Sequence, residues 1–270
     1  MADQLRVGDW RAVLADVGEV DTLLTDPPFS ARTHAGARTT AGLELGNPET
    51  ETRGIAFDAW DAFDVADFVD GWAPRVRAWF VALTDHVLWP AYEARLQAAG
   101  FLVFHPIPCV IRNMTVRQMG DGPASWAVWA VVARRPGYLD PGAVARDARQ
   151  TRIDGTGKRR KRADGTIADV TPRPADAPTR IWRALPGAYV VDRERGGGGR
   201  GKPADLEAAL VRDYSNPGWL VCDPCAGRGG FLVAAAAAAA AGRRYVGAEI
   251  DPAVAATAAD RLANLQPILL

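Results

Sequence analysis

The residues best suited to chemistry form a four-residue segment, Asp26-Pro27-Pro28-Phe29, which follows a short apolar run. The two prolines fix the backbone φ angle and remove two N–H donors, so the carbonyls around them stay free to accept hydrogen bonds. Asp26 adds an anionic acceptor, and Phe29 adds a flat apolar face. This set suits a planar group that carries an exocyclic amine, because it offers acceptors for the amine hydrogens and a ring to stack on. A rigid turn with a buried phenylalanine is the alternative interpretation.

A second segment, Asp223–Gly229 (DPCAGRG), lies between an apolar run that predicts a strand and an alanine-rich run that predicts a helix. Gly227 and Gly229 allow the backbone to approach a ligand closely, and the N-terminus of the following helix can face a polar group. Glu249 ends the next predicted strand, about twenty residues further on, where an acidic side chain can bind the hydroxyls of a ribose. The segment predicts a site for a nucleoside-bearing cofactor, with a tight turn beside a surface acid as the alternative.

Both segments resemble motifs of the amino-directed DNA methyltransferases. Asp26–Phe29 resembles their DPPY/F motif, and Asp223–Gly229 resembles their S-adenosylmethionine motif, D-P-F-x-G-x-G. Three further segments resemble the same family: Val7–Asp9 its G-D element, Lys202–Pro203 its K-P element, and Gly242–Asp251 its G-R-R-Y-I-G-x-E segment. The order of these motifs along the chain resembles the β-type circular permutation of the family.

The resemblance implies a site-specific DNA methyltransferase that transfers a methyl group from S-adenosylmethionine to the exocyclic amine of a flipped base, with adenine N6 as the expected target. The residues that it places in the catalytic site are Asp26, Pro27, Pro28 and Phe29. The residues that it places around the cofactor are Asp9 at the adenine, Glu249 at the ribose, Asp223 and Lys202 at the methionine end, and Pro224, Cys225, Gly227 and Gly229 in the turn.

The chain departs from the family pattern within the glycine-rich segment. Cys225 replaces the usual phenylalanine, and Arg228 and Gly230 replace small hydroxyl residues. Since that loop acts mostly through its backbone, these changes bear on cofactor affinity more than on cofactor identity. The Cys222-x-x-Cys225 spacing also fits a zinc or redox site, but the chain offers no second pair of ligands at metal spacing, so no metal is predicted.

Several alternative functions remain open at this level. N4-cytosine methylation uses the same acceptor geometry, although Asp rather than Ser at position 26 favours adenine. An RNA methyltransferase and a non-catalytic relative that binds DNA or cofactor are the others. A nicotinamide dehydrogenase is disfavoured, because Asp26–Phe29 would have no role in it.

The elements that must position these residues predict an α/β fold. Short apolar runs alternate with helical stretches, as in a Rossmann-like, doubly wound and mostly parallel sheet. The expected strands are Val20–Thr25, Thr84–Leu88, Phe101–Phe104, Trp126–Ala133, Trp219–Cys222 and Arg244–Ile250. The expected helices are Asp67–Leu83, Pro90–Ala99, Asp205–Tyr214 and the alanine-rich run after Gly229. The stretch from Ser30 to about Asp58 lacks periodicity and predicts a long loop that could close over a bound base.

The composition predicts one methyltransferase domain in two parts. Residues 1–136 would form its catalytic part and 201–270 its cofactor-binding part, around an insert at 137–200 that is rich in Pro, Gly, Asp and Arg. This insert falls where the resemblance places the target-recognition region. It carries the strongest basic run, which would contact DNA phosphates or simply form a solvated loop: Lys158, Arg159, Arg160, Lys161 and Arg162.

Charge and cysteine content narrow the partners and the compartment. The chain of 270 residues has 32 basic and 32 acidic side chains, so binding to DNA must come from local rather than net charge. Three cysteines and the lack of a signal peptide or an apolar span predict a cytoplasmic protein that does not interact with a membrane. The expected partner is double-stranded DNA, a cognate restriction nuclease is a partner that such enzymes can have, and a monomer or homodimer is expected.

Overall fold

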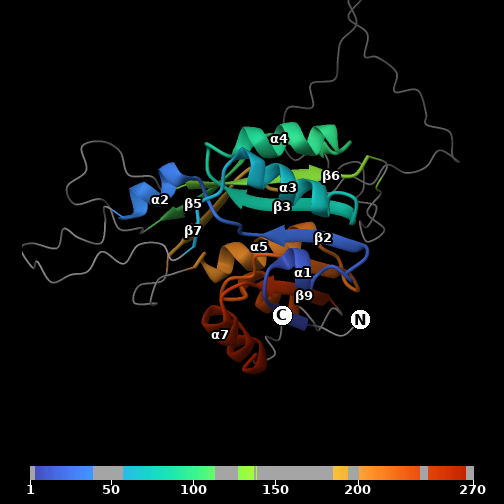
Figure 1. The fold of residues 1–270 in the computed structure, drawn as a ribbon, viewed down its shortest axis with the longest axis vertical. Coiled ribbons are helices and arrows are strands. Elements are labelled where there is room, and N and C mark those ends of the chain that lie inside the picture. The colour runs from blue at the N-terminus through green and yellow to red at the C-terminus, as the bar shows by residue number, and fades with distance from the viewer. Residues whose placement is uncertain are drawn as a thin grey trace, which may run out of the picture. The chain divides into compact units, whose positions relative to one another are not determined.

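A nine-stranded β-sheet forms the centre of the described part of the chain (Figure 1). The strand order is β1-β9-β8-β2-β3-β6-β5-β7, with β4 paired to β6 beside this path. Strand β6 is antiparallel to β3, β4 and β5, whereas every other pairing is parallel, so within the described residues only β6 is reversed. The strands are β1 (Gln4–Val7), β2 (Val20–Thr25), β3 (Val76–Thr84), β4 (Leu102–Val103), β5 (Ile107–Arg112), β6 (Ala127–Arg134), β7 (Tyr189–Asp192), β8 (Leu220–Asp223) and β9 (Arg244–Glu249).

The computed structural model describes residues 4–38, 57–112, 127–136, 138, 185–193, 201–237 and 243–265. Nearly all of them belong to one compact unit, which combines Met1–Tyr138 with Gly187–Leu270. The stretch between, Leu139–Pro186, is assigned to a second unit and lies almost entirely outside the described residues. The helices of the first unit are α1 (Trp10–Val13), α2 (Ala31–Arg38), α3 (Ala62–Trp72), α4 (Trp89–Ala98), α5 (Ala204–Tyr214), α6 (Gly230–Ala237) and α7 (Pro252–Ala263).

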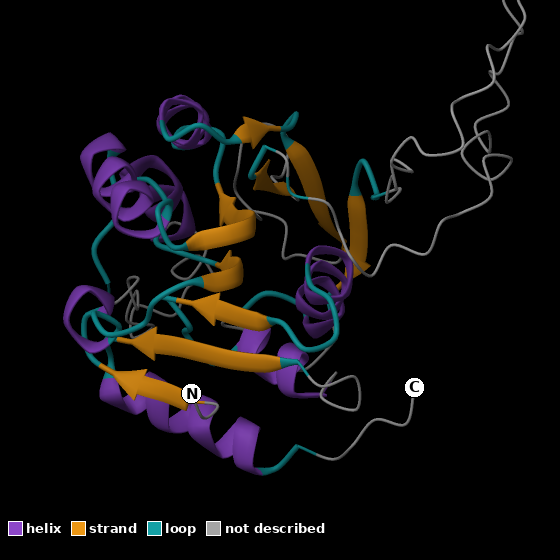
Figure 2. Cartoon of the chain, turned by 90° about the vertical axis from the view of Figure 1, so that its right-hand side faces the viewer, coloured by secondary structure: helices purple, strands orange, loops and turns teal. Residues whose placement is uncertain are grey.

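Helices cover both faces of the sheet (Figure 2). Neighbouring residues of a strand point to opposite faces, and in β3 the ring of Phe80 contacts Phe68 of α3 whereas that of Trp79 contacts Tyr214 of α5. The crossovers explain this arrangement, because β2 to β3 and β8 to β9 run in opposite directions across the sheet, and right-handed connections then place α3 and α6 on opposite faces. The prediction of a doubly wound, mostly parallel sheet is confirmed, and the reversal of direction lies between β8 and β2.

Two predicted elements are wrong around β3. The expected helix Asp67–Leu83 is in fact α3 followed by β3, because Pro74 ends the helix and β3 is buried along almost its whole length. A strand buried on both faces has apolar residues at every step, including the steps of four that suggested a helix. The expected strand Thr84–Leu88 is not formed. Thr84 ends β3, and the residues after it form a turn in which Asp85 accepts hydrogen bonds from the backbone of the residues that lead into α4.

The stretch from Ser30 to Asp58, expected to be a loop, begins with helix α2, and residues 39–56 lie outside the described residues. The sequence of α2 shows no helical periodicity of apolar residues. Its first turn is supported instead by hydrogen bonds to Asp85, which lies far away in the chain. Within the stretch expected to be the insert, β7 joins the sheet beside β5. No helix among the described residues is both long enough and apolar enough to cross a membrane.

Candidate active site

The two segments singled out in the sequence meet at the carboxyl ends of neighbouring strands. Strands β2 and β8 pair in parallel, with Thr22 opposite Val221 and Leu23 opposite Cys222, so the turns that follow them lie at one edge of the sheet. A hydrogen bond joins them directly, because the hydroxyl of Thr25 donates to Oδ1 of Asp223 at 2.7 Å. Residues that lie 198 positions apart in the chain are thereby fixed against each other, at the place where α/β sheets bind ligands.

The turn after β2, residues 26–30, is held by side chains and backbone from other elements. The carbonyl of Phe29 accepts a hydrogen bond from the backbone of Trp60 at 3.0 Å. Asp85 accepts from the backbone N–H of Ser30 at 2.9 Å, from its hydroxyl at 2.5 Å and from the hydroxyl of Thr33 at 2.6 Å. Burial alone would raise the pKa of Asp85, but these hydrogen bonds and those from the following backbone outweigh it and lower the pKa. Asp85 therefore carries a stable negative charge that fixes the end of this turn.

Lys202 contacts the carboxylate of Asp26. Its Nζ atom lies 2.6 Å from each carboxylate oxygen and 4.6 Å from the centre of the Phe29 ring. The two charged side chains are only 16% and 29% exposed, so water screens this ion pair less than one on the open surface. The lysine precedes α5 and was expected at the methionine end of the cofactor; in this structure it lies against Asp26, in the turn after β2.

The turn after β8, residues 224–229, is held mostly by backbone. Gly227 and Gly229 have φ angles of 53° and 76°, which favour glycine. A Cβ atom at position 229 would lie 2.9 Å from Cβ of Ala258 in α7, whereas one at position 227 would meet nothing within 4 Å. Glycine at 229 therefore permits close helix packing, and glycine at 227 faces open space.

Glu249, at the end of β9, fixes the same turn from the neighbouring strand. One of its carboxylate oxygens accepts from the backbone N–H of Gly227 at 2.7 Å, and the other from that of Asp251 at 2.9 Å. A carboxylate oxygen has more than one lone pair, so each can still accept a hydroxyl hydrogen. The side chain is therefore oriented by the backbone while it keeps capacity for a ligand.

The carboxyl ends of β1 and β9 each bring one exposed apolar side chain to this edge. Val7 of β1 pairs with Glu249 and is 54% exposed, and Ile250 directly after Glu249 is 64% exposed. Asp9 lies two residues after Val7. Its carboxylate accepts a hydrogen bond from the backbone N–H of Arg11 at 2.8 Å, which caps α1, and pairs with the Arg11 side chain. An apolar surface beside an oriented acid fits the base and ribose of a nucleoside.

Asp223 lies deeper than the sequence analysis suggested. It is 1% exposed, and Oδ1 accepts both the Thr25 hydroxyl and the backbone N–H of Cys225. Burial raises the pKa of Asp223 well above its usual range, only partly offset by these hydrogen bonds. Burial likewise raises the pKa of the Cys222 and Cys225 thiols, and both cysteines are free. Among the described residues no cluster of three or more candidate ligands could hold a metal ion.

Glu207 of α5 occupies the space over Gly230. A Cβ atom at position 230 would lie 1.8 Å from a carboxylate oxygen of Glu207, so the absent side chain at Gly230 makes room for this acid. Burial raises the pKa of Glu207 to about 7, against the attraction of Arg261 and Lys202, and Asp26 adds to the rise. Among the described residues none donates a hydrogen bond to this carboxylate.

Similar folds are found among solved structures, although no protein-family model and no curated protein sequence matches the chain. The M1.HpyAVI–SAM complex aligns with a TM-score of 0.58 and 17% identity over 96% of this chain and 98% of the other. TTHA0409 from Thermus thermophilus, a candidate DNA modification methylase complexed with S-adenosylmethionine, aligns with a TM-score of 0.55 and 21% identity over 97% and 93%. The cytosine-N4-specific PvuII DNA methyltransferase aligns with a TM-score of 0.56 and 13% identity over 99% and 89%. The chain has the S-adenosylmethionine-dependent methyltransferase fold.

Within this methyltransferase fold, the residues expected in the catalytic and cofactor sites lie at the carboxyl ends of β1, β2, β8 and β9, apart from Lys202, which reaches Asp26 from the start of α5. Their roles stay predictions. The basic residues expected to contact DNA, Lys158 to Arg162, lie outside the described residues.

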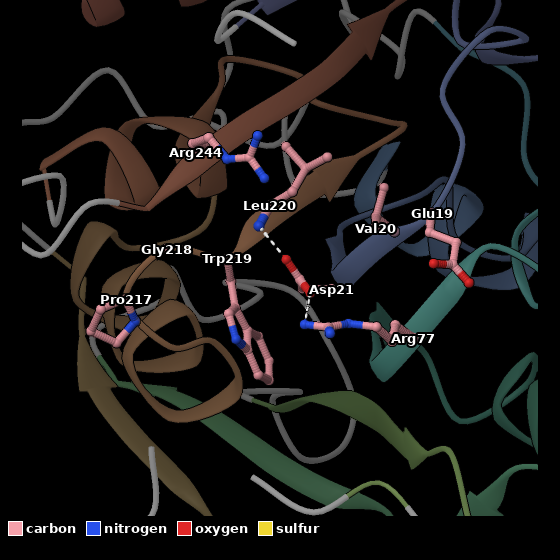
Figure 3. A pocket seen from close by; sticks show the side chains of 9 residues that line it. All are labelled: Glu19, Val20, Asp21, Arg77, Pro217, Gly218, Trp219, Leu220 and Arg244. Carbon is pink, nitrogen blue, oxygen red and sulfur yellow. Dashed lines mark hydrogen bonds and ion pairs between the residues drawn. The ribbon is translucent and has the colours of Figure 1, made fainter. Parts of the chain in front are cut away.

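Sequence reasoning missed three residues of this edge: Asp85, Glu207 and Ile250. Asp85 and Glu207 act through partners 55 and 23 positions away, which no local pattern reveals. Ile250 gave no signal in the sequence, because a single apolar residue at the end of a strand is as typical of a buried position as of an exposed one. A pocket among the described residues lies elsewhere, at the amino ends of β2, β8 and β9, where Asp21 bridges Arg77 and the backbone of Leu220 (Figure 3).

Proposed function

We propose that this chain is a DNA methyltransferase that uses S-adenosylmethionine and methylates an exocyclic amino group, with adenine N6 as its target. One observation carries the proposal: the hydrogen bond from Thr25 to Asp223 brings the amine-binding turn and the nucleoside-binding turn together at one edge of the sheet. The methyltransferase fold and the two similar structures that contain S-adenosylmethionine support it.

The residues around the glycine turn fit the cofactor. Gly227 leaves open space beside the backbone, Glu249 presents an oriented carboxylate for the ribose, and Val7 and Ile250 offer an apolar surface for adenine. Asp9 would meet the adenine end, and Lys202 the carboxylate of the methionine end. Asp223 would act through the turn that it holds, since it is buried. When bound, S-adenosylmethionine supplies an electrophilic methyl group on a sulfonium.

The turn after β2 would prepare the amine for attack. The carboxylate of Asp26 and the carbonyl of Pro27 would each accept one N–H, which draws the nitrogen out of conjugation and directs its lone pair away from the ring. Positioning and fixed charge then lower the barrier without a covalent intermediate. The base must leave the duplex to reach this turn, where Phe29 would stack on it. Ser30 and Asp85 keep Phe29 in place.

The choice of adenine rests on Asp at position 26, and cytosine N4 is the competing target, since the similar PvuII enzyme is cytosine-N4-specific. The region 137–200 would recognise DNA, with Lys158 to Arg162 at the phosphates, and the salt dependence of DNA binding tests that assignment. A cytoplasmic location belongs to the same proposal, and a cognate restriction nuclease is a partner that such an enzyme can have.

A methyl-transfer assay tests the proposal. The purified chain is incubated with unmethylated genomic DNA and S-adenosylmethionine carrying a labelled methyl group, and the DNA is then digested to nucleosides for mass spectrometry. We expect labelled N6-methyladenine, and a loss of roughly a thousandfold or more in rate for Asp26→Ala with S-adenosylhomocysteine binding retained.

The matched control is Asp70→Ala, which removes another ion-paired aspartate, on the exposed surface of α3. It should leave the rate unchanged. Labelled N4-methylcytosine would correct the target but keep the enzyme class. Label in RNA only, or an Asp26→Ala variant that retains full activity, would contradict the proposal.

A further inference from the structure

We propose that Lys202 is a positioning residue that occupies the amine subsite in the free enzyme and leaves it when the carboxylate of the cofactor binds. This inference rests on the proposed function, because it concerns the same turn. It adds an order of events: the cofactor binds first, and only then can Asp26 accept the target amine.

The lysine imitates the target amine in two ways. It donates hydrogen bonds to both oxygens of Asp26 at 2.6 Å, and its cation lies 4.6 Å from the centre of the Phe29 ring. The acceptor and the aromatic face are the two features that the proposed reaction requires for the base. Because the ammonium occupies both, Lys202 and the target amine cannot bind at the same time.

The charges at this edge explain why an anion would move the lysine. The carboxyl groups of four residues gather there, namely Asp26, Glu207, Asp223 and Glu249. Burial raises the pKa of Asp223 and Glu207 and so reduces their share of the negative charge. A carboxylate that enters such a site is repelled unless a cation meets it. Lys202 contacts this cluster through its ion pair with Asp26. Arg261 and Lys202 both attract Glu207, and the effect of Arg261 is the larger. Arg261, by comparison, donates to the carbonyl of Arg228.

The position of Lys202 in the chain makes the exchange feasible. It lies directly before Pro203 and the first turn of α5, so its flexible side chain can change partner without movement of the helix. The exchange also reconciles the two assignments of this residue. The sequence resemblance places Lys202 at the methionine end of the cofactor, the structure places it on Asp26, and both hold if the lysine moves between them.

Two ligands distinguish displacement of Lys202 by the cofactor carboxylate from an effect of filling the nucleoside site alone. S-adenosylhomocysteine carries the amino-acid carboxylate, whereas 5′-methylthioadenosine has the same nucleoside and lacks it. The side-chain carboxyl ¹³C resonance of Asp26 is assigned by comparison with Asp26→Asn. It reports whether the Lys202 ammonium still contacts the Asp26 carboxylate. We expect S-adenosylhomocysteine to shift it to the value found in Lys202→Met, and 5′-methylthioadenosine to bind without this shift.

Affinities measured by calorimetry provide the second readout. Lys202→Met should weaken the binding of S-adenosylhomocysteine by about tenfold and that of 5′-methylthioadenosine by less than about twofold. Lys202→Arg should restore most of the lost affinity for S-adenosylhomocysteine. The control is Arg212→Met, which removes a cation that pairs with Asp213 on the same helix and should change neither affinity. Unfolding temperatures confirm that all variants are folded.

The inference is overturned if S-adenosylhomocysteine binds and leaves the Asp26 resonance unchanged, or if both ligands shift it equally; in either case the proposed function survives. If neither ligand binds to the wild-type chain, the proposed function itself fails, and the inference fails with it.

Discussion

The turn after β2 is held by side chains and a backbone group that come from other parts of the fold, whereas the turn after β8 is held by its own backbone and two strand-end acids. Asp85, Trp60 and Lys202 supply the contacts of the first. In the second, the backbone accepts conformations that glycine permits, and Glu249 and Asp223 bind N–H groups of the turn. In the proposed function, the first turn would orient acceptors for the target amine, and the second would leave room for the much larger cofactor.

This difference has a consequence for substitutions. A turn fixed by a single buried carboxylate depends on that carboxylate, and its loss should affect both stability and geometry. A turn fixed by backbone depends on the absence of side chains, and added atoms should affect packing at one glycine and ligand space at the next.

Asp85→Ala should have the largest effect on stability. Five donors would lose their acceptor: the N–H and hydroxyl of Ser30, the hydroxyl of Thr33 and the backbone N–H groups of Val87 and Leu88. We expect a loss of about 4 kcal/mol in the free energy of unfolding, measured by urea denaturation. Since the pKa of Asp85 is lowered in the folded state, its contribution is present at neutral pH and is lost as the pH falls below about 4.

Asp85→Asn keeps one acceptor oxygen and should lose less than half as much stability. An exposed control, Asp67→Ala, removes an acid that pairs with Arg11 on the surface and should change stability by less than about 1 kcal/mol. If Asp85→Ala were no more destabilising than this control, the turn after β2 would not depend on Asp85, and the contrast between the turns would fail.

The contacts that hold the turn after β8 could be predicted from the sequence better than those that hold the turn after β2. Strands β2 and β8 and the segment Asp223–Gly229 have local signals, because buried parallel strands are apolar runs and a glycine turn is set by its own residues. The pairing of Lys202 with Asp26 joins residues 176 positions apart. No spacing rule reveals such a contact, because it arises only when the sheet brings α5 and β2 together. The boundary between α3 and β3 was missed for a related reason, since burial on both faces hides the strand period.

Glu207 sharpens the comparison, since it is a side chain of α5 that fills the space over Gly230, directly after the turn that follows β8. Its pKa is raised to about 7 in the folded chain and is near 4.5 when unfolded, so folding costs more as the pH rises through this window. The wild type should therefore lose up to ~3 kcal/mol of stability between about pH 4.5 and 7, relative to Glu207→Gln. Unfolding curves of both proteins across this range measure the difference.

The curves should become parallel above about pH 7, where Glu207 is ionised in both states. Glu93→Gln, on α4, serves as the control for removing a glutamate charge from a helix. A wild type and Glu207→Gln with the same pH dependence would mean that the carboxylate is well solvated, and that Gly230 is not needed to make room for it.

The two glycines of the turn after β8 provide the smallest and most specific test. Gly229→Ala must adopt a φ near 76° and would place Cβ 2.9 Å from Ala258, so it should lose about 2 kcal/mol of stability. Gly227→Ala shares the strained backbone, with a φ near 53°, but its Cβ meets nothing within 4 Å, so the loss should be near 1 kcal/mol.

For Gly227→Ala the larger effect should appear in the binding of S-adenosylhomocysteine, because the methyl group enters the open space assigned to the nucleoside. Urea unfolding of both variants measures the loss of stability, and calorimetric titration with S-adenosylhomocysteine measures the loss of ligand affinity. A Gly227→Ala variant that binds as tightly as the wild type would show that the cofactor does not approach the backbone at this glycine.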